Sequence, residues 1–465
     1  MNQKQITELG TASIRSLLFK YAMPGIIAMT AMSLYNMVDS IFIGHGVGAL
    51  ALSGLTVAKP FMDICAAFGT LVGVGASSLV AIKLGEKDYR SANDILANVI
   101  ILNVILGAII MVVGLFWLDP ILYAFGASDA TIAYAHEYME IILWGNILTH
   151  IYYGLNSMLR SVGHPRISMY ATILAVSLNV ALDPIFIFVL DMGVRGAALA
   201  TIISQLVSVI VELIIFLNPK EVIHFHRGIW KLRRDITMRA LGIGTAPFLM
   251  HMAACFVVIV LNNQLLRYGG DMEIATFGMT NRFIFFFVMI VMGIQQGMQP
   301  IVGYNYGAQQ FQRVNKVLKL AIWGATVITT LTFLVGELIP EIAVSLFTTD
   351  EGLIARAAEG FRIVVLVFPI VGFQMVTSNF FQSIGMANKA IFLSLTRQLL
   401  FLLPCLIILP TFMGAAGIWW SMPISDAIAS IVAAVLLYKQ YQAFKTHNSY
   451  SHERTLRNQP GTPTG

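Results

Sequence analysis

Gly75–Asn93, GASSLVAIKLGEKDYRSAN, and Gly297–Asn315, GMQPIVGYNYGAQQFQRVN, are two copies of one stretch of sequence, 222 residues apart. Gly85 and Gly307 occupy the same place in the two copies. Self-similarity at a fixed offset indicates that a structural unit occurs more than once in a chain. The fold is therefore expected to consist of two related halves.

The correspondence extends over most of the chain, with an offset that drifts only between 221 and 224 residues. Further matching positions are Pro24 and Pro247, Gly54 and Gly278, Ser161–Gly163 and Ser383–Gly385, and Met192–Gly193 and Met413–Gly414.

The composition places this repeat in a membrane. Hydrophobic residues make up 57% of the 465 residues and charged residues only 11%, where a soluble domain carries about 25% charged residues. A water-soluble fold cannot hide that much apolar surface. A secreted disulfide scaffold is excluded as well, because the three cysteines are an odd number and lie in apolar runs.

Apolar runs of about 20 residues are long enough to cross the hydrocarbon core. Between breaks that carry charges, proline or glycine, the sequence contains twelve candidate spans, near 16–43, 51–82, 94–117, 132–157, 167–190, 195–217, 238–266, 274–304, 315–338, 358–382, 388–410 and 416–438. The first span begins too late and is too long for a cleaved signal peptide, so it is expected to stay as an anchor.

The basic residues predict the orientation of these spans. If the N-terminus is cytoplasmic, 22 of the 29 Lys and Arg residues fall in cytoplasmic loops and tails. Only Arg195, Arg267 and Arg356 fall in the opposite loops. The positive-inside rule therefore predicts that both termini are cytoplasmic. The basic pI reflects this topology, and no nucleic-acid partner is expected.

These features predict an all-α membrane protein of twelve transmembrane helices in two six-helix lobes. The expected divisions are an N-terminal lobe over 1–217, a basic cytoplasmic linker over 218–239, a C-terminal lobe over 240–440 and a polar, disordered tail over 441–465. Six is an even number, so the two lobes share one orientation. Parallel repeats that face each other across a cavity are a transporter architecture; alternatively, the duplication is old and has no functional asymmetry left.

Two acidic residues argue for asymmetry. Asp39 lies about five residues from the outer end of the first span, and Asp183 about eight from the outer end of the fifth. An ionised group at the bilayer centre costs at least about 2.5–3.5 kcal/mol, so the presence of each acid within a span has to be explained by a function or by a structural partner. A carboxyl group taken out of water, beside a second one, is suited to carry a proton or to bind a cation. The repeat counterparts carry no acid; they are Asn262 or Asn263, and Pro404 or Cys405.

Polar neighbours of this pair are predicted by helical spacing. Asn179 lies one turn before Asp183 on the same face and can hydrogen-bond either form of the carboxyl group. Thr201 offers a hydroxyl group from the sixth span. The alternative is that both acids are structural groups near the membrane interface.

Other charges within the spans have simpler interpretations. Lys59 and Asp63 are four residues apart and are expected to neutralise each other. Arg397 and Asp426 lie at similar depth on the last two spans, where they can pair. Glu212 is close enough to the inner end of its span for its side chain to reach the interface.

No feature indicates an enzyme. The sequence contains no HExxH, GxSxG or P-loop motif. His224 and His226 fall in a basic loop, where solvated side chains are expected rather than metal ligands. No metal or organic cofactor is predicted apart from a coupling ion.

The combination of the two six-span units, Pro24, the Asp39–Asp183 pair and the glycine-rich second and eighth spans resembles the MATE (multidrug and toxic compound extrusion) transporter family. The resemblance covers about residues 12–440. It is closest to the bacterial DinF and MepA-like branch, whose essential acids lie in the N-terminal lobe. The stretches that carry acids in the NorM branch have only amides here: Asn262, Asn263, Gln295, Gln296, Gln374 and Asn379.

The resemblance also implies roles for individual residues. It implies a cation-coupling network of Asp39, Asn179, Asp183 and Thr201, extended toward the cavity by Tyr35, Tyr138 and Asn156. Pro24 would be a hinge that lets the first span bend when the acids change protonation. The same oxygen atoms that accept a proton are able to ligate Na⁺.

The resulting hypothesis is a bacterial inner-membrane antiporter that exports cationic or amphipathic drugs in exchange for H⁺ (or Na⁺) by alternating access, and so confers antibiotic resistance. A functional monomer is expected, because each chain contains both lobes. The alternatives are a flippase for lipid-linked saccharides, a membrane-embedded enzyme and a channel. A flippase needs a cationic cavity, for which only Arg282 and Arg397 are candidates.

Overall fold

The computed structural model describes residues 3–226, 228–346 and 350–457, and every regular element in these ranges is a helix. The helices are α1 Gln3–Thr11, α2 Ile14–Gly46, α3 Ala49–Gly85, α4 Tyr89–Phe116, α5 Leu118–Ala124, α6 Ile132–Trp144, α7 Asn146–Ser161, α8 Pro165–Pro184, the π-helix η1 Ile185–Val189, α9 Gly193–Leu217, α10 Arg234–Gly307, α11 Phe311–Leu338, α12 Pro340–Ser345, α13 Glu351–Val365, α14 Phe368–Ser383, α15 Ala387–Leu395, the π-helix η2 Thr396–Leu402, α16 Leu403–Met413 and α17 Ala415–Arg457.

The number of long spans differs from the predicted twelve. Within the described residues, ten helices are long and apolar enough to cross a membrane, and the bent pair α13 and α14, at 54° to each other, makes an eleventh. The predicted span 132–157 is two shorter helices, α6 and α7, which meet at Gly145. A Cβ atom at Gly145 would lie 2.1 Å from the Ile202 side chain, so the break lies at a close contact with α9.

The seventh and eighth predicted spans are joined in α10. This helix runs for 74 residues and turns at Gly270, whose φ of 70° and ψ of −168° are not helical. At the other end of the chain, α17 continues to Arg457, although the tail from residue 441 was predicted to be disordered. Residues 458–465, where the rest of that prediction falls, lie outside the described residues.

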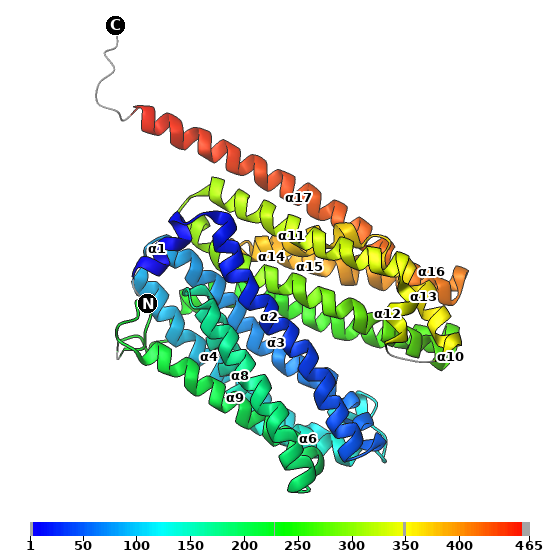
Figure 1. The fold of residues 1–465 in the computed structure, drawn as a ribbon. Coiled ribbons are helices and arrows are strands. Elements are labelled where there is room, and N and C mark those ends of the chain that lie inside the picture. Colours follow the sequence, from blue (N-terminus) through cyan, green and yellow to red (C-terminus); the bar gives the residue numbers. More distant parts are fainter. Residues whose placement is uncertain (1–2, 227, 347–349, 458–465) are drawn as a thin grey trace.

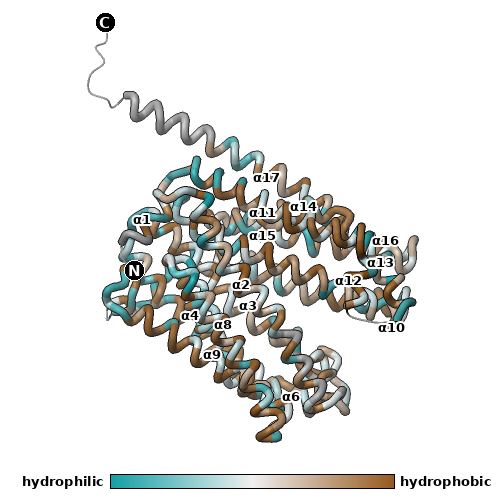
Figure 2. Tube along the Cα trace, in the orientation of Figure 1, coloured by the Kyte–Doolittle hydropathy of each residue, from teal (hydrophilic) through white to brown (hydrophobic). Residues whose placement is uncertain are grey.

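The helices form two groups that converge at one end of the molecule and diverge at the other (Figure 1). Helices α2–α9 make one group and the second part of the chain, from α10 to α17, makes the other. Hydrophobic residues cover most of the length of the helices, and hydrophilic residues gather at the end near the N-terminus (Figure 2).

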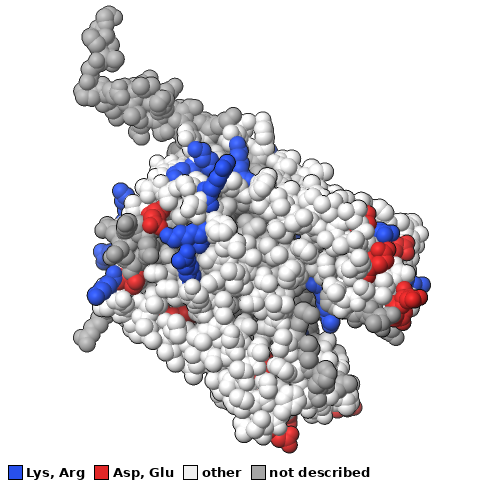
Figure 3. All heavy atoms as spheres, viewed as in Figure 1, with Lys and Arg blue, Asp and Glu red and all other residues white. Residues whose placement is uncertain are grey.

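The two ends carry opposite charge. Lys and Arg side chains gather at the end near the N-terminus, and Asp and Glu at the diverging tips (Figure 3). We call these the basic end and the acidic end. Between the tips that carry α6 and α12, the surface is hollowed (Figures 1 and 3).

Glycines hold the two groups together toward the basic end. Helices α3 and α10 approach so closely that an added Cβ atom would lie 1.7–2.1 Å from a backbone carbonyl oxygen of the other helix at four positions. We call these positions the glycine seam: Gly75, Gly85, Gly244 and Gly307. Two of them, Gly85 and Gly307, are repeat partners in the sequence. Only glycine permits backbones to approach this closely, so the basic end is closed.

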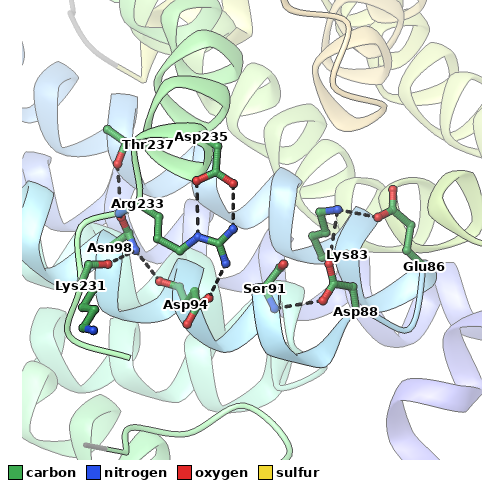
Figure 4. Close-up of polar contacts among 10 residues, drawn as sticks. All are labelled: Lys83, Glu86, Asp88, Ser91, Asp94, Asn98, Lys231, Arg233, Asp235 and Thr237. Carbon is green, nitrogen blue, oxygen red and sulfur yellow. Dashed lines mark hydrogen bonds and ion pairs between the residues drawn. The ribbon is translucent and has the colours of Figure 1, made fainter. Parts of the chain in front are cut away.

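The segment that joins the two groups is fixed to α4 at the basic end (Figure 4). Asn98 accepts hydrogen bonds from the backbone amide of Arg233 (3.0 Å) and from the hydroxyl of Thr237 (3.2 Å), and donates to the carbonyl of Lys231 (3.3 Å). Arg233 also forms an ion pair with Asp94 at 2.8 Å. The start of α10 is therefore bound to the first group of helices.

Asp88 caps the N-terminus of α4 beside this junction (Figure 4). Its carboxylate accepts a hydrogen bond from the backbone amide of Ser91 at 3.1 Å and lies 3.5 Å from the Lys83 ammonium group. Burial acts to raise the pKa of Asp88, but the Ser91 hydrogen bonds and Lys83 outweigh it, so the pKa lies below its usual value.

Candidate functional site

Two carboxyl groups meet between α2 and α8. Asp39 lies in the last third of α2, and Asp183 lies in the last turn of α8, where it is 0% exposed. The two side chains are close enough to share a hydrogen bond. One oxygen of each, Oδ1, has no hydrogen-bond partner among the described residues. The predicted proximity of the two acids is therefore present in the structure.

The backbone around Asp183 explains how this carboxyl group is presented. Pro184 follows it directly and has no amide hydrogen to donate to the preceding turn. The next residues, Ile185–Val189, form the π-helix η1, in which the Leu190 amide bonds back to Ile185 over five residues. Single π-helical turns occur frequently at functional sites.

Asn179 and Thr201 join the pair to α9. With the amide nitrogen of Asn179 turned toward Asp183, it donates to Oδ2 at 3.0 Å, and the amide oxygen accepts from Thr201 Oγ1 at 3.2 Å. With the amide reversed, its nitrogen donates to Thr201 Oγ1 at 3.2 Å, and its oxygen faces Asp183. The first arrangement suits a carboxylate and the second a protonated carboxyl group.

Two tyrosines complete the cluster. Tyr35 lies one turn before Asp39 on α2, and its hydroxyl is 3.5 Å from Thr201 Oγ1. Tyr138, on α6, is buried, and its side chain lies near Thr201. Six of the residues expected from the sequence, from four different helices, therefore lie together: Tyr35, Asp39, Tyr138, Asn179, Asp183 and Thr201.

Asn156 does not belong to this cluster. Its amide nitrogen donates to Glu212 Oε1 at 2.8 Å, and its oxygen accepts from the Arg160 guanidinium group. Glu212 is 0% exposed, so the expectation that it reaches the membrane interface is wrong. The face of α9 that carries Glu212 packs against α7 and α8, which covers the carboxyl group.

Pro24 lies within α2, where this helix packs against α10. The neighbouring Gly25 is so close to α10 that an added Cβ atom would lie 2.7 Å from the Gly293 carbonyl oxygen. Because proline removes one hydrogen bond from the helix and its ring crowds the preceding turn, α2 is weakest at this position.

The buried acids of the second half have cationic partners. Asp426 accepts from Arg397 Nε at 2.6 Å, which confirms the predicted pair. Glu273, which the sequence did not single out, lies 3.3 Å from Arg356 and accepts from the indole of Trp419 at 3.0 Å. Each of these two carboxylates is therefore neutralised by the arginine that it binds.

The Asp39–Asp183 pair has no such partner. No Lys or Arg forms an ion pair with either side chain among the described residues. Lys59 is near enough to act on Asp39 electrostatically, but its ammonium group binds Asp63 at 2.6 Å, as predicted. Two negative charges in contact repel each other, and a proton or a sodium ion between them removes that repulsion. The pair is therefore suited to exchange a small cation.

Comparison with known proteins identifies the family. The family model described as MatE matches residues 24–185 and 245–407. The multidrug export protein MepA of Staphylococcus aureus (strain N315) is 27% identical over 438 residues, which cover 94% of this chain and 96% of MepA. MepA of Staphylococcus haemolyticus (strain JCSC1435) is 26% identical over the same shares of the two chains.

Solved structures give the same result. The MATE multidrug transporter DinF-BH in complex with rhodamine 6G is 35% identical, with a TM-score of 0.87 over 94% of this chain and 98% of that one. A MATE transporter in the bent conformation is 25% identical, with a TM-score of 0.90 over 97% of this chain and 100% of that one. The predicted resemblance is confirmed: the chain belongs to the MatE family of multi-pass membrane transporters.

Proposed function

We propose that this transporter is a multidrug efflux antiporter that exports cationic or amphipathic compounds and takes up a proton, or a sodium ion, in exchange. The observation that carries the proposal is the Asp39–Asp183 pair. It lacks a cationic partner among the described residues, whereas Glu273 and Asp426 in the second half each bind an arginine. A site that must alternately bind and release a cation cannot be occupied permanently by a positively charged side chain such as that of arginine.

The packing of the two groups of helices supports alternating access. In this proposal, residues 1–217 and 240–440 are two lobes, joined by the basic linker 218–239, that rock against each other at the glycine seam. The basic end is closed by this seam and the acidic end is hollowed. Because the positive-inside rule assigns the basic end to the cytoplasm, the conformation corresponds to an outward-facing state.

Coupling then follows from differential binding. In the outward-facing state, a cation from outside neutralises the Asp39–Asp183 pair and removes the negative charge that attracts a cationic drug, so the drug leaves. Asn179 stabilises either form of the pair by turning its amide over. Pro24 lets α2 bend when these contacts change, and the seam then opens to the cytoplasm.

The same residues limit the identity of the ion and the substrate. Carboxylate, amide and hydroxyl oxygens, from Asp39, Asp183, Asn179 and Thr201, are suited to a proton and also to Na⁺. The solved complex of DinF-BH contains rhodamine 6G, which makes this dye a suitable test substrate. The proposed location is the bacterial cytoplasmic membrane, with both termini inside and the monomer as the functional unit.

A lipid-linked saccharide flippase is disfavoured by one contact. Of the two arginines that were candidates to bind a pyrophosphate, Arg397 is bound to Asp426 and is not free to hold an anion. Arg282 alone does not make a cationic cavity.

The proposal is tested by efflux of the rhodamine dye from proteoliposomes, with a proton gradient and a sodium gradient imposed separately. We expect one of the gradients to drive efflux in the wild type and not in Asp39→Asn. Asp129→Asn, which changes an exposed acid of the same lobe, should behave as the wild type. Full activity in a folded Asp39→Asn variant would refute the proposal, and failure of both gradients in the wild type would favour a lipid-linked substrate.

A further inference from the structure

A second buried carboxyl group lies in the same lobe, toward the basic end. Glu212 is 0% exposed, and it follows Thr201 by eleven residues on α9, a distance of about 16 Å along the helix. Its Oε1 accepts from Asn156, whereas Oε2 has no partner among the described residues. A buried carboxyl oxygen without a partner is uncommon in proteins and calls for an explanation.

A continuous polar face connects this carboxyl group to the Asp39–Asp183 pair. On α8, four buried polar residues recur at helical spacing: Ser168, Thr172, Asn179 and Asp183. On α9, four polar residues also recur at helical spacing: Thr201, Ser204, Ser208 and Glu212. Each set lies on one side of its helix, because the spacings are three, four or seven residues.

The two polar faces are turned toward each other. The helices run antiparallel, with Asn179 bonded to Thr201 and Ser208 Oγ donating to the Ala171 carbonyl at 2.8 Å. At the basic end, α7 completes the column, because Asn156 binds both Glu212 and the Ser168 carbonyl (3.1 Å). The column therefore runs inside the first group of helices, among α7, α8 and α9.

Orphaned polar atoms mark this column along its length. Asp183 Oδ1, Ser204 Oγ and Glu212 Oε2 are all buried without a partner among the described residues. They lie at the two ends and near the middle of the column. Buried hydroxyl and carboxyl oxygens without protein partners are the groups that bound water satisfies.

We propose that Glu212 is a second proton-binding site, and that the polar column carries protons between it and the Asp39–Asp183 pair, toward the cytoplasm. The inference rests on the proposed function, with H⁺ as the coupling ion. A proton leaves the Asp183 carboxyl group, passes along the Thr201 and Ser204 hydroxyls and intervening water, and binds the Glu212 carboxylate. Asp183 becomes a carboxylate, Glu212 becomes a carboxylic acid, and the net charge does not change.

The surroundings of Glu212 permit both the ionised and the protonated form of its carboxyl group. The charged or titratable groups that act on it are Arg160 and Tyr152, both from α7. Arg160 does not bind Glu212 directly; Asn156 lies between them, with its oxygen on Arg160 and its nitrogen on Glu212. A direct ion pair would hold the carboxylate permanently, whereas this bridged arrangement leaves Oε2 able to accept a proton.

Glu212→Gln tests the proposal. Glutamine keeps an oxygen for the Asn156 hydrogen bond but cannot carry a proton, so a structural role alone is preserved. A positioned proton carrier accelerates proton transfer by about a hundredfold or more, and we expect proton-driven efflux of the rhodamine dye to fall at least about tenfold. Binding of the dye to the purified protein should stay within about twofold of the wild-type Kd, because the Glu212 side chain is 0% exposed and cannot contact a bound compound. Ser204→Ala should slow efflux in the same way.

The control is Glu137→Gln, a half-exposed acid of the same lobe, which should transport as the wild type. Wild-type efflux rates in Glu212→Gln would overturn the proposal. Loss of efflux with equal loss of dye binding or of thermal stability would also overturn it, since Glu212 would then be structural. If the wild type shows no proton-driven efflux, the proposed function itself fails, and the relay with it.

Discussion

The glycine seam makes a quantitative prediction about the closed basic end. A Cβ atom at Gly244 would lie 1.7 Å from the Leu71 carbonyl oxygen of the facing helix. Real Cβ atoms essentially never approach another heavy atom closer than 3.0 Å. In Gly244→Ala, helices α3 and α10 must therefore separate by at least about 1.3 Å, or the closed conformation is lost.

The size of the effect follows from this overlap. Forcing extra atoms into a packed contact costs about 1–3 kcal/mol. This energetic cost applies only to the conformation in which the basic end is closed. It therefore shifts the equilibrium toward the conformation in which the basic end is open, by about 5- to 150-fold. Gly242→Ala is the matched control, since no atom lies within 4 Å of an added Cβ atom there. Both variants gain about 0.5–1 kcal/mol of helix stability, so their difference isolates the steric effect.

Labelling of a cysteine within the seam, between Gly75 and Gly85 on α3, measures the shift. Ser78 is 0% exposed and accepts a hydrogen bond from Gln299, on the other side of the seam, at 2.7 Å. In a background without the native cysteines, Ser78→Cys should react with a polar maleimide about 5- to 150-fold faster in Gly244→Ala than in Gly242→Ala. Equal labelling rates and equal thermal stability in the two variants would refute the close approach described here.

Three further predictions concern individual contacts. Asn98→Ala leaves two donors at the start of α10 unsatisfied and should lower the free energy of unfolding by about 1–3 kcal/mol, measured by thermal unfolding in detergent. Asp94→Ala breaks a partly exposed ion pair and should lower the free energy of unfolding by at most about 1 kcal/mol, and by less at high salt. A larger effect for Asp94→Ala would contradict this ranking. Thr201→Val removes the hydroxyl at the centre of the acidic cluster and should reduce efflux. Thr411→Val, at an exposed position, is the control and should not reduce it. Equal efflux by the two variants would show that the Thr201 hydroxyl is dispensable. Because the pKa of Asp88 is lower in the folded state than in the unfolded one, its stabilising effect is complete above about pH 4 and is lost as the pH falls further. Asp88→Asn should therefore make the Tm less sensitive to acid. An unchanged dependence of the Tm on pH would contradict this.

The sequence predicted the features that depend on depth in the membrane. The repeat and the apolar runs located the helices, and counting residues from the ends of the spans placed Asp39 and Asp183 at a similar level. Helical spacing predicted that Asn179 shares a face with Asp183. Depth and spacing are properties of single helices, so they can be obtained without knowing how the helices pack.

Features that depend on packing could not be obtained in this way. Glu212 was expected at the interface from its depth, but the direction of its side chain is decided by which face of α9 packs against α7. For the same reason, Asn156 lies with Glu212 and not with Asp39. The polar residues at helical spacing on both α8 and α9 were the signal that could have revealed the column.

The central claim is that the Asp39–Asp183 pair gives up a bound cation when a drug binds. With H⁺ as the coupling ion, proton release upon drug binding tests this claim most directly. The rhodamine dye is added to the purified protein in a weakly buffered detergent solution, and the released protons are measured with a pH electrode. The account predicts proton release by the wild type and none by folded Asp183→Asn. Equal release by both proteins, or none by a wild type that binds the dye, would contradict it.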